Sequence, residues 1–385
     1  MGRNYNVISA DGHIDLNPDI WRDRVAASMR ERAPKRVKMP NGSDAVVVDG
    51  GEPNTIGVTR SVRVNKEDMA TQVPTFESCA GTGPPAQRLE EQDRDGIDAE
   101  VVFSQISFVL EQAKDRELYC ELVRAYNEFL GEEYMAPAPD RIIPMGVIPT
   151  SGIDDAVREL EHCAGLGLRG VKLDKFPSGR GYPTAEDDRF WAASLELGVA
   201  LTNHNTGNMG SGKGGEPAFP YERRPGPDVH VKEPMNYFFR FTNDAMVGAV
   251  QMAFAGVWDR FPTLKMYWAE TMIGWFEYGL WQLDDHYQRY MPMIHQFWGL
   301  HYLDRKPSEY LGENNYWGFL HDPIGIKRRE CIGYEKLMWA TDFAHAASEY
   351  PNSIPVMEKD FEGVPAHEKR AMLVDNCVKY FGLDA

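Results

Sequence analysis

Short apolar runs and longer amphipathic stretches alternate along most of the chain. Brief apolar runs bounded by Gly, Pro or polar residues are typical of β-strands, and apolar residues spaced three and four apart are typical of helices. Eight runs have the strand pattern: residues 4–10, 100–104, 141–149, 169–173, 199–204, 264–270, 315–320 and 336–341. Helical patterns separate most of them: residues 88–95, 115–134, 153–166, 187–197, 238–261 and 326–331, with a last one at 366–381. This alternation predicts an α/β protein with a (β/α)₈, or TIM, barrel.

Two regions interrupt this rhythm. Residues 35–86 carry turn signals and β-rich pieces at 45–48 and 57–64 but no helical period, which predicts a small β-rich cap inserted after the first strand. Long loops are expected after strands five and six, and the first of them is rich in Gly and Pro. Such barrels often form one domain, so residues 1–385 are expected to be a single barrel domain with 35–86 as its cap.

Composition and charge exclude several classes of protein. The chain has 43% hydrophobic and 26% charged residues and a formal net charge of −17. An acidic surface disfavours binding to nucleic acid or anionic membranes, and no apolar stretch is long enough to span a bilayer. The five cysteines are scattered without a C-x-x-C pair, so neither a disulfide framework nor a thiolate zinc site is predicted. We therefore expect a cytoplasmic protein without a targeting segment.

Five residues that can bind metals stand at or just past the ends of predicted strands: Asp11, His13, His204, Glu270 and Asp342. Taken singly, each has an ordinary alternative as a helix cap, a surface histidine or a hydrogen-bonded loop residue. Taken together, they belong to strands one, five, six and eight, whose carboxyl ends converge on one face of a barrel. Imidazole and carboxylate ligands favour zinc, iron or manganese. The pattern therefore predicts a centre with one or two divalent metal ions.

Several short strings carry a resemblance to a known family. They are Ser-Ala-Asp-Gly-His at 9–13, Gly-Val-Lys-Leu at 170–173, Phe-Ala-Gly-Val-Trp-Asp-Arg-Phe-Pro at 254–262, Ala-Glu-Thr-Met-Ile-Gly-Trp at 269–275 and Ala-Thr-Asp-Phe-Ala-His at 340–345. In combination the chain resembles the amidohydrolase-related metal-dependent hydrolases, a family that includes aminocarboxymuconate semialdehyde decarboxylase and the resorcylate-type decarboxylases. The resemblance implies metal ligation by Asp11, His13, His204 and Asp342, and it suggests a homodimer or larger assembly.

The chain departs from the decarboxylases of this family at two positions. Those enzymes carry His-x-His or Glu-x-His on strand one, where this chain has Asp11 and His13, and a proton-handling histidine after strand six, where it has Glu270. A carboxylate is better suited to binding a second metal or acting as a base than to protonating a ring carbon. Glu270 is therefore expected to ligate or bridge metal or to hydrogen-bond metal-bound water. The alternative is that Glu270 caps a helix that begins at Thr271.

The remaining candidates are weaker. Asp342 is expected to bind the metal and to accept a proton from the attacking water. His345, three residues later, is expected to support the metal ligands without binding the metal itself. Lys172 is interpreted as structural. Aromatic residues near the late strands suggest a roomy apolar pocket for a small molecule with an apolar body: Tyr221, Trp275, Phe276, Tyr278, Trp281, Tyr287, Phe297, Trp298, Tyr302, Tyr316 and Trp317. A basic loop at 213–232, with Lys213, Arg223, Arg224, His230 and Lys232, is either solvated surface or a contact for a carboxylate or phosphate.

The leading hypothesis is a metal-dependent hydrolase that attacks an ester, thioester, lactone or amide bond with metal-activated water. No G-x-S-x-G elbow is present to suggest a serine nucleophile. The alternative is a metal-dependent, non-oxidative decarboxylase of an aromatic or enol carboxylic acid. A third possibility is a barrel that has lost its metal and binds an apolar ligand. Metal analysis and product analysis distinguish the three.

Overall fold

The computed structural model describes residues 3–54, 73–204, 245–345 and 347–384. Eight strands form one sheet in which every pairing is parallel and the spatial order follows the chain. Nearly all strand residues are buried, as expected for parallel strands covered on both faces. The strands are β1 (Ile8–Ile14), β4 (Ala99–Ser104), β5 (Ile142–Val147), β6 (Gly170–Lys172), β7 (Ala200–His204), β8 (Met266–Ala269), β9 (Asn315–Phe319) and β10 (Leu337–Trp339).

The sheet nearly closes into a barrel where its first and last strands meet. The residues that follow β10 make the closing contacts: the backbone N–H of Asp342 donates to the carbonyl of Asp11 at 3.0 Å, and the N–H of His13 donates to the carbonyl of Phe343. The N–H of Thr341 also donates to Ser9 Oγ at 3.0 Å. The predicted TIM-barrel fold is confirmed.

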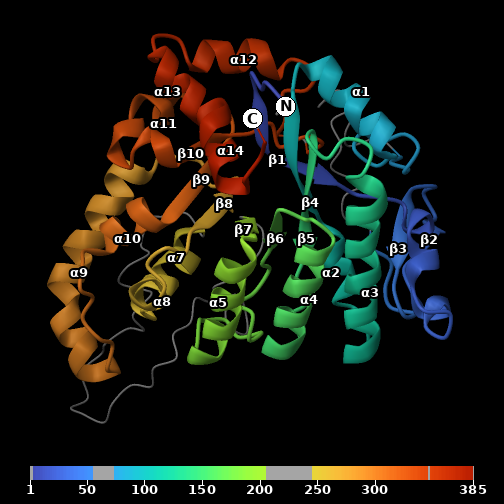
Figure 1. Ribbon diagram of the computed structural model, residues 1–385, viewed down its shortest axis with the longest axis horizontal. Coiled ribbons are helices and arrows are strands. Elements are labelled where there is room, and N and C mark those ends of the chain that lie inside the picture. Colours follow the sequence, from blue (N-terminus) through green and yellow to red (C-terminus); the bar gives the residue numbers. More distant parts are fainter. Residues whose placement is uncertain (1–2, 55–72, 205–244, 346, 385) are drawn as a thin grey trace.

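Helices surround the strands, as Figure 1 shows. α5 ends at Gly198, the predicted stop, whose φ of 68° lies in the left-handed region that favours glycine. None of the helices in the described ranges is both long and apolar enough to cross a membrane. The helices are α1 (Pro85–Asp95), α2 (Ile106–Leu110), α3 (Arg116–Phe129), α4 (Ile153–Gly165), α5 (Asp188–Leu197), α7 (Ala245–Phe254), α8 (Val257–Arg260), α9 (Phe276–Trp298), α10 (Pro307–Asn314), α11 (Pro323–Lys327), α12 (Ser353–Asp360), α13 (Ala366–Arg370) and α14 (Asn376–Phe381).

Two predictions about the elements need correction. The first strand runs over Ile8–Ile14 rather than 4–10, so Asp11 and His13 lie inside β1 and not beyond its end. The connection after strand six is long but helical, because α9 and α10 occupy most of it. Its pattern was obscured by Pro292, which stands inside α9. The loop expected after strand five lies outside the described residues, as does the basic stretch 213–232.

The inserted region contains a two-stranded antiparallel sheet, β2 (Lys35–Lys38) with β3 (Asp44–Val47). In Figure 1 it lies beside α3. Arg32 ties it there by ion pairs with Asp49 at 2.8 Å and with Asp115, the N-cap of α3, at 2.5 Å. The predicted piece at 45–48 corresponds to β3, β2 was not predicted, and the piece at 57–64 lies outside the described residues.

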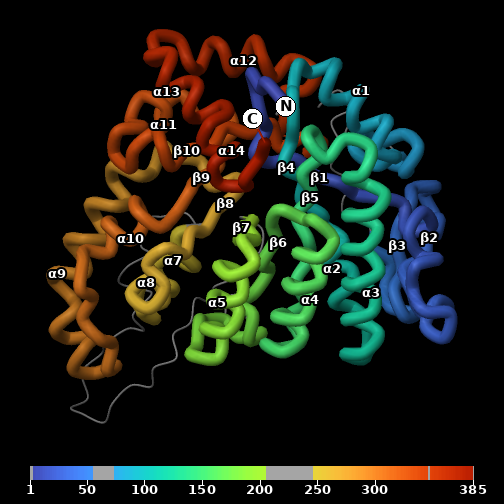
Figure 2. The backbone as a smooth tube through the Cα atoms, in the orientation of Figure 1, coloured from blue at the N-terminus to red at the C-terminus, as the bar shows by residue number. Residues whose placement is uncertain are grey.

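The end of the chain returns to its beginning. Figure 2 shows the last helices beside β1. Arg370, the last residue of α13, donates to the carbonyl of Tyr5 at 2.5 Å, and the N–H of Arg3 donates to the carbonyl of Asp384 at 3.1 Å. These contacts help hold the first strand next to β10, where the barrel closes.

Candidate metal centre

Asp11 and His13 lie two residues apart on β1, so their side chains leave the same face of the strand. Both are buried, and His13 Nε2 lies 3.5 Å from Asp11 Oδ1. Gly12 stands between them at the end of an irregularity in the pairing of β1 with β4. The strand thus presents a carboxylate and an imidazole side by side toward one point.

His204 and Glu270 approach this pair from neighbouring strands. His204 is the last residue of β7, and its Nε2 lies 3.3 Å from Asp11 Oδ2. Glu270 directly follows β8, and its Oε2 lies 3.7 Å from the same His204 nitrogen. The Glu270 side chain is 23% exposed, whereas Asp11, His13 and His204 are almost fully buried. Glu270 is therefore the member of this set best placed to meet a substrate.

Asp342 joins the group from the other side of the barrel seam. Its Oδ1 lies 3.0 Å from His13 Nε2 and 3.0 Å from His345 Nδ1. Asp342 and Glu270 both have left-handed backbones, with φ of 54° and 56°. Such conformations are costly for residues other than glycine and cluster at functional sites. No helix begins at Thr271, so the capping role considered for Glu270 is not realised in the structure.

The donor atoms form two overlapping groups with ligand-like spacing. One contains Asp11, His13 and His204 and the other His13, Asp342 and His345; within each, the candidate ligand atoms lie within 4.8 Å of one another. The carboxylate oxygens of Asp11 and Asp342 are buried and have no well-oriented hydrogen-bond donor among the residues that the structure describes. Buried carboxylates without donors are costly unless a cation neutralises them. The residues therefore fit a divalent metal ion.

The electrostatics of the group agree with metal binding. Burial lowers the pKa of His204 to about 4, and burial with the nearby His345 lowers the pKa of His13 well below its ordinary value. Both imidazoles are thus held neutral, the form that binds metals. Burial, opposed by His204, raises the pKa of Glu270 to about 7. Burial opposes ionisation of Asp342 too, but the imidazoles of His13 and His345, each 3.0 Å from its Oδ1, hold its pKa well below its usual range.

One polar partner of the site was not predicted from the sequence. Gln105 follows β4, is buried, and its amide lies 2.7 Å from His345 Nε2. With Asp342 on Nδ1 and Gln105 on Nε2, the His345 ring is held at both nitrogens. It also stacks on the His13 ring with centroids 3.7 Å apart. Only the fold brings Gln105 and His345 together, since no local pattern marks residues so distant in sequence.

Lys172 agrees with its interpretation as structural. Its ammonium donates to the carbonyl of Ser104 at 3.0 Å and to Ser107 Oγ at 2.9 Å, and it pairs with Asp174 at 3.0 Å. These partners use its three donors. The Lys172 side chain therefore connects the carboxyl ends of β4 and β6.

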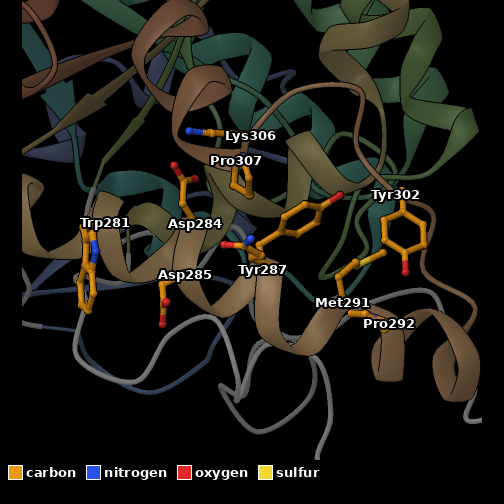
Figure 3. Close-up of a pocket in the computed structure, with 10 residues that line it drawn as sticks. Trp281, Asp284, Asp285, Tyr287, Met291, Pro292, Tyr302, Lys306 and Pro307 are labelled. Atoms are coloured by element: carbon orange, nitrogen blue, oxygen red, sulfur yellow. The ribbon is translucent and has the colours of Figure 1, made fainter.

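Within the described ranges, the aromatic residues singled out in the sequence divide between buried and exposed positions. Phe276, Phe297, Tyr316 and Trp317 are buried, while Tyr278, Trp281 and Tyr302 are about half exposed or more. A cavity of about 650 Å³ lies along α9. Figure 3 shows residues that line it, among them Trp281, Tyr287, Met291, Tyr302, Asp284, Asp285 and Lys306. None of the residues of the metal-binding groups lines it. This cavity is thus separate from the candidate centre, and Tyr221 lies outside the described residues.

The sequence profile of the amidohydrolases matches residues 76–383, which is most of the chain. This protein belongs to the amidohydrolase family. The family assignment confirms the resemblance, and the matched region contains seven of the eight barrel strands, all except β1.

Three solved structures show how far the fold is shared. An amidohydrolase from Mycobacterium avium subsp. paratuberculosis K-10 is 17% identical with a TM-score of 0.72, over 99% of this chain and 100% of that one. The 5-carboxyvanillate decarboxylase of Sphingomonas paucimobilis is 19% identical with a TM-score of 0.64, over 99% and 100%. A dihydroxybenzoic acid decarboxylase from Polaromonas sp. JS666, with bound manganese and 2-nitroresorcinol, is 18% identical with a TM-score of 0.63, over 99% and 98%.

These comparisons correct the leading functional hypothesis. Two of these three structures are named as decarboxylases of aromatic acids, so the prediction of acyl-bond hydrolysis is wrong. That prediction depended on treating Glu270 as a poor proton donor. A carboxyl group with a pKa of about 7 keeps a protonated fraction near neutral pH, so the premise does not hold for the partly buried Glu270.

Proposed function

We propose that this protein is a metal-dependent, non-oxidative decarboxylase of a hydroxylated aromatic carboxylic acid. The observation that carries the proposal is the position of Glu270, a partly exposed carboxyl group beside His204 and the buried Asp11–His13 pair. The fold shared with decarboxylases of 5-carboxyvanillate and dihydroxybenzoic acid supports the same reaction class.

Asp11, His13, His204 and Asp342 are proposed to hold the divalent ion. Manganese is the first candidate, because the similar Polaromonas enzyme contains it, and nitrogen and carboxylate ligands also suit zinc and iron. When bound, the ion would supply positive charge that holds the substrate's oxygen groups in place and favours the ionised form of its hydroxyl group, which makes the ring carbon easier to protonate. The structure supports one shared centre, since both groups of ligands contain His13.

Glu270 is proposed to deliver the proton that replaces the carboxylate. Decarboxylation of a hydroxybenzoate requires a proton to bond to the ring carbon, after which the bond to the carboxylate carbon breaks, carbon dioxide leaves and the ring regains its aromatic electrons. A carboxylic acid with a pKa near neutrality is suited to such a transfer. The Glu270 carboxylate then regains a proton from solvent.

His345 and Gln105 are proposed to orient Asp342. His345 Nδ1 contacts Asp342 Oδ1, and Gln105 holds the other ring nitrogen. An imidazole in contact with a metal-binding carboxylate fixes the orientation of that carboxylate. Loss of such an orienting residue typically weakens metal affinity or activity by about 10- to 100-fold. His345 thus acts through Asp342, as a positioning residue.

The test uses metal-loaded protein and a panel of hydroxybenzoic and carboxyvanillic acids. Carbon dioxide release and formation of the corresponding phenol are measured by mass spectrometry, and reactions in heavy water report the carbon that gains deuterium. The proposal expects deuterium at the carbon that lost the carboxylate. Absence of carbon dioxide from every acid, with metal bound at one equivalent, would reject it.

A further inference from the structure

A buried ion pair lies behind the candidate metal centre, and the proposed reaction does not use it. Arg88 on α1 is 1% exposed and Glu100 on β4 is 2% exposed, with Arg88 Nε 3.4 Å from Glu100 Oε2. Buried ion pairs can often be replaced by apolar side chains of similar volume without loss of stability. Core filling alone therefore does not account for these two charges.

Arg88 contacts two of the chain segments that carry metal-ligand candidates. Its Nη2 donates to the backbone carbonyl of His13. Its guanidinium carbon also lies 4.9 Å from the ring centre of Phe343, the residue after Asp342. Since the N–H of His13 donates to the Phe343 carbonyl, one guanidinium supports β1 and the segment after β10 at the point where they join.

Glu100 fills the space beneath Gly12. A Cβ atom on Gly12 would lie 2.1 Å from Glu100 Oε1, so no other residue fits between Asp11 and His13 while Glu100 keeps this position. The same Oε1 lies 3.5 Å from Thr341 Oγ1, next to Asp342 in sequence. The Glu100 carboxylate thus contacts Gly12, between the ligand candidates Asp11 and His13, and Thr341, which precedes the ligand candidate Asp342.

The end of the inserted region reaches the same cluster. Gly81 has a φ of 70°, and a Cβ there would lie 2.9 Å from Ala344 Cβ and 3.2 Å from the His13 carbonyl. Its backbone N–H lies 3.3 Å from Glu91, also buried on α1. Three chain segments therefore pack around Arg88, and two of them carry ligands.

We propose that Arg88 and Glu100 are positioning residues that set the distance between His13 and Asp342 and thereby the affinity for the divalent ion. This inference rests on the metal centre of the proposed function. The critical ligand atoms, His13 Nε2 and Asp342 Oδ1, are 3.0 Å apart. Sites of this kind lose function when supporting residues allow displacements on the order of 1 Å.

The experiment compares manganese affinity in three variants by titration calorimetry on protein stripped of metal. Arg88→Met removes the hydrogen bond to His13 and the charge, and Arg88→Lys keeps the charge with a single donor atom. Arg329→Met is the matched control: Arg329 is 12% exposed and pairs with Glu368, and neither residue belongs to the metal-binding groups. Thermal unfolding of the metal-free proteins measures the purely structural effect of each change.

We expect Arg88→Met to weaken manganese binding by about tenfold or more and Arg88→Lys by less, whereas Arg329→Met lowers stability without changing affinity. If Arg88→Met does not fold, Arg88→Lys decides: weaker binding supports the proposal and unchanged binding overturns it. Wild-type affinity in folded Arg88→Met would overturn this inference alone. A wild-type protein that binds no divalent metal would overturn the proposed function as well, so the two failures are distinguishable.

Discussion

The backbone N–H of Asp342 donates a 3.0 Å hydrogen bond to the carbonyl of Asp11, so two proposed ligands from opposite ends of the sequence are also backbone partners. The hydrogen bonds that close the barrel and the side chains that face the proposed ion therefore belong to the same residues. Any change that loosens the seam between β1 and the segment after β10 is expected to disturb the metal centre.

Asp342→Asn should abolish turnover and weaken manganese binding by about 100-fold while the protein stays folded, because the amide cannot supply the charge that a ligating carboxylate provides. Calorimetric titration measures manganese affinity, and far-ultraviolet circular dichroism measures whether the variant is folded. Asp154→Asn, a change at an exposed carboxylate on α4 that pairs with Arg189, is the control and should leave affinity unchanged. An active Asp342→Asn protein would assign the ligand role elsewhere.

Glu270→Gln should lower kcat by about 100-fold or more, because it removes the group proposed to protonate the ring carbon. The metal content should remain at the wild-type value, since the side-chain volume is kept and Glu270 is not in either metal-binding group. Glu277→Gln changes an exposed carboxylate on α9 that pairs with Arg328, and this variant should behave as wild type. A lost metal equivalent in Glu270→Gln would instead make Glu270 a ligand.

Gln105→Leu should reduce kcat by about tenfold while His345→Ala reduces it further, because Gln105 acts on Asp342 only through the His345 ring. The double variant should be no worse than His345→Ala, which a cycle of kcat/KM values measures. Additive losses would show that Gln105 acts independently of His345.

Glu159 on α4 should make stability depend on pH. Burial raises the pKa of this carboxyl from 4.5 to about 7, against the hydrogen bond from Asn127. The folded protein therefore binds a proton more tightly than the unfolded chain, so this contribution is complete below pH 4.5 and is lost as pH rises toward 7. Glu159→Gln keeps the acceptor oxygen and should raise stability at pH 8, by on the order of 1–3 kcal/mol, with little change at pH 4.5.

Urea unfolding of both proteins at the two pH values measures this difference. Glu161→Gln, at an exposed position on the same helix, is the control and should leave the pH dependence of stability as it is in the wild type. A pH dependence that persists unchanged in Glu159→Gln would show that another group causes it.

Removal of metal should lower the midpoint of thermal unfolding by several degrees, and manganese should restore it. A ligand that binds only the folded state adds about 2.7 kcal/mol at a concentration 100 times its Kd. Because the proposed ligands join the first strand to the segment after the last, the ion should stabilise the closed barrel as a whole. Identical midpoints with chelator and with excess manganese would contradict the proposed centre.

The sequence predicted the strands and the candidate ligands because both depend on local signals. Apolar runs mark barrel strands, and the polar residues that end them converge by the geometry of the fold. The Arg88–Glu100 pair and the contact between Gln105 and His345 were not predictable in this way, since each depends on packing between distant segments. The length of α9 was not predicted for a different reason. A proline inside a helical pattern usually indicates that the helix ends there, but α9 continues past Pro292.

The closing of the barrel at its own metal site makes ion retention a test of chain completeness. During synthesis Asp11, His13 and His204 emerge well before Asp342, and the seam cannot form until the last strand and the residues after it are available. A chain truncated before Asp342 would lack both the closing hydrogen bonds and one of the proposed ligands. Metal affinity would then report whether the two ends of the barrel have joined, because the same residues form the seam and the proposed centre.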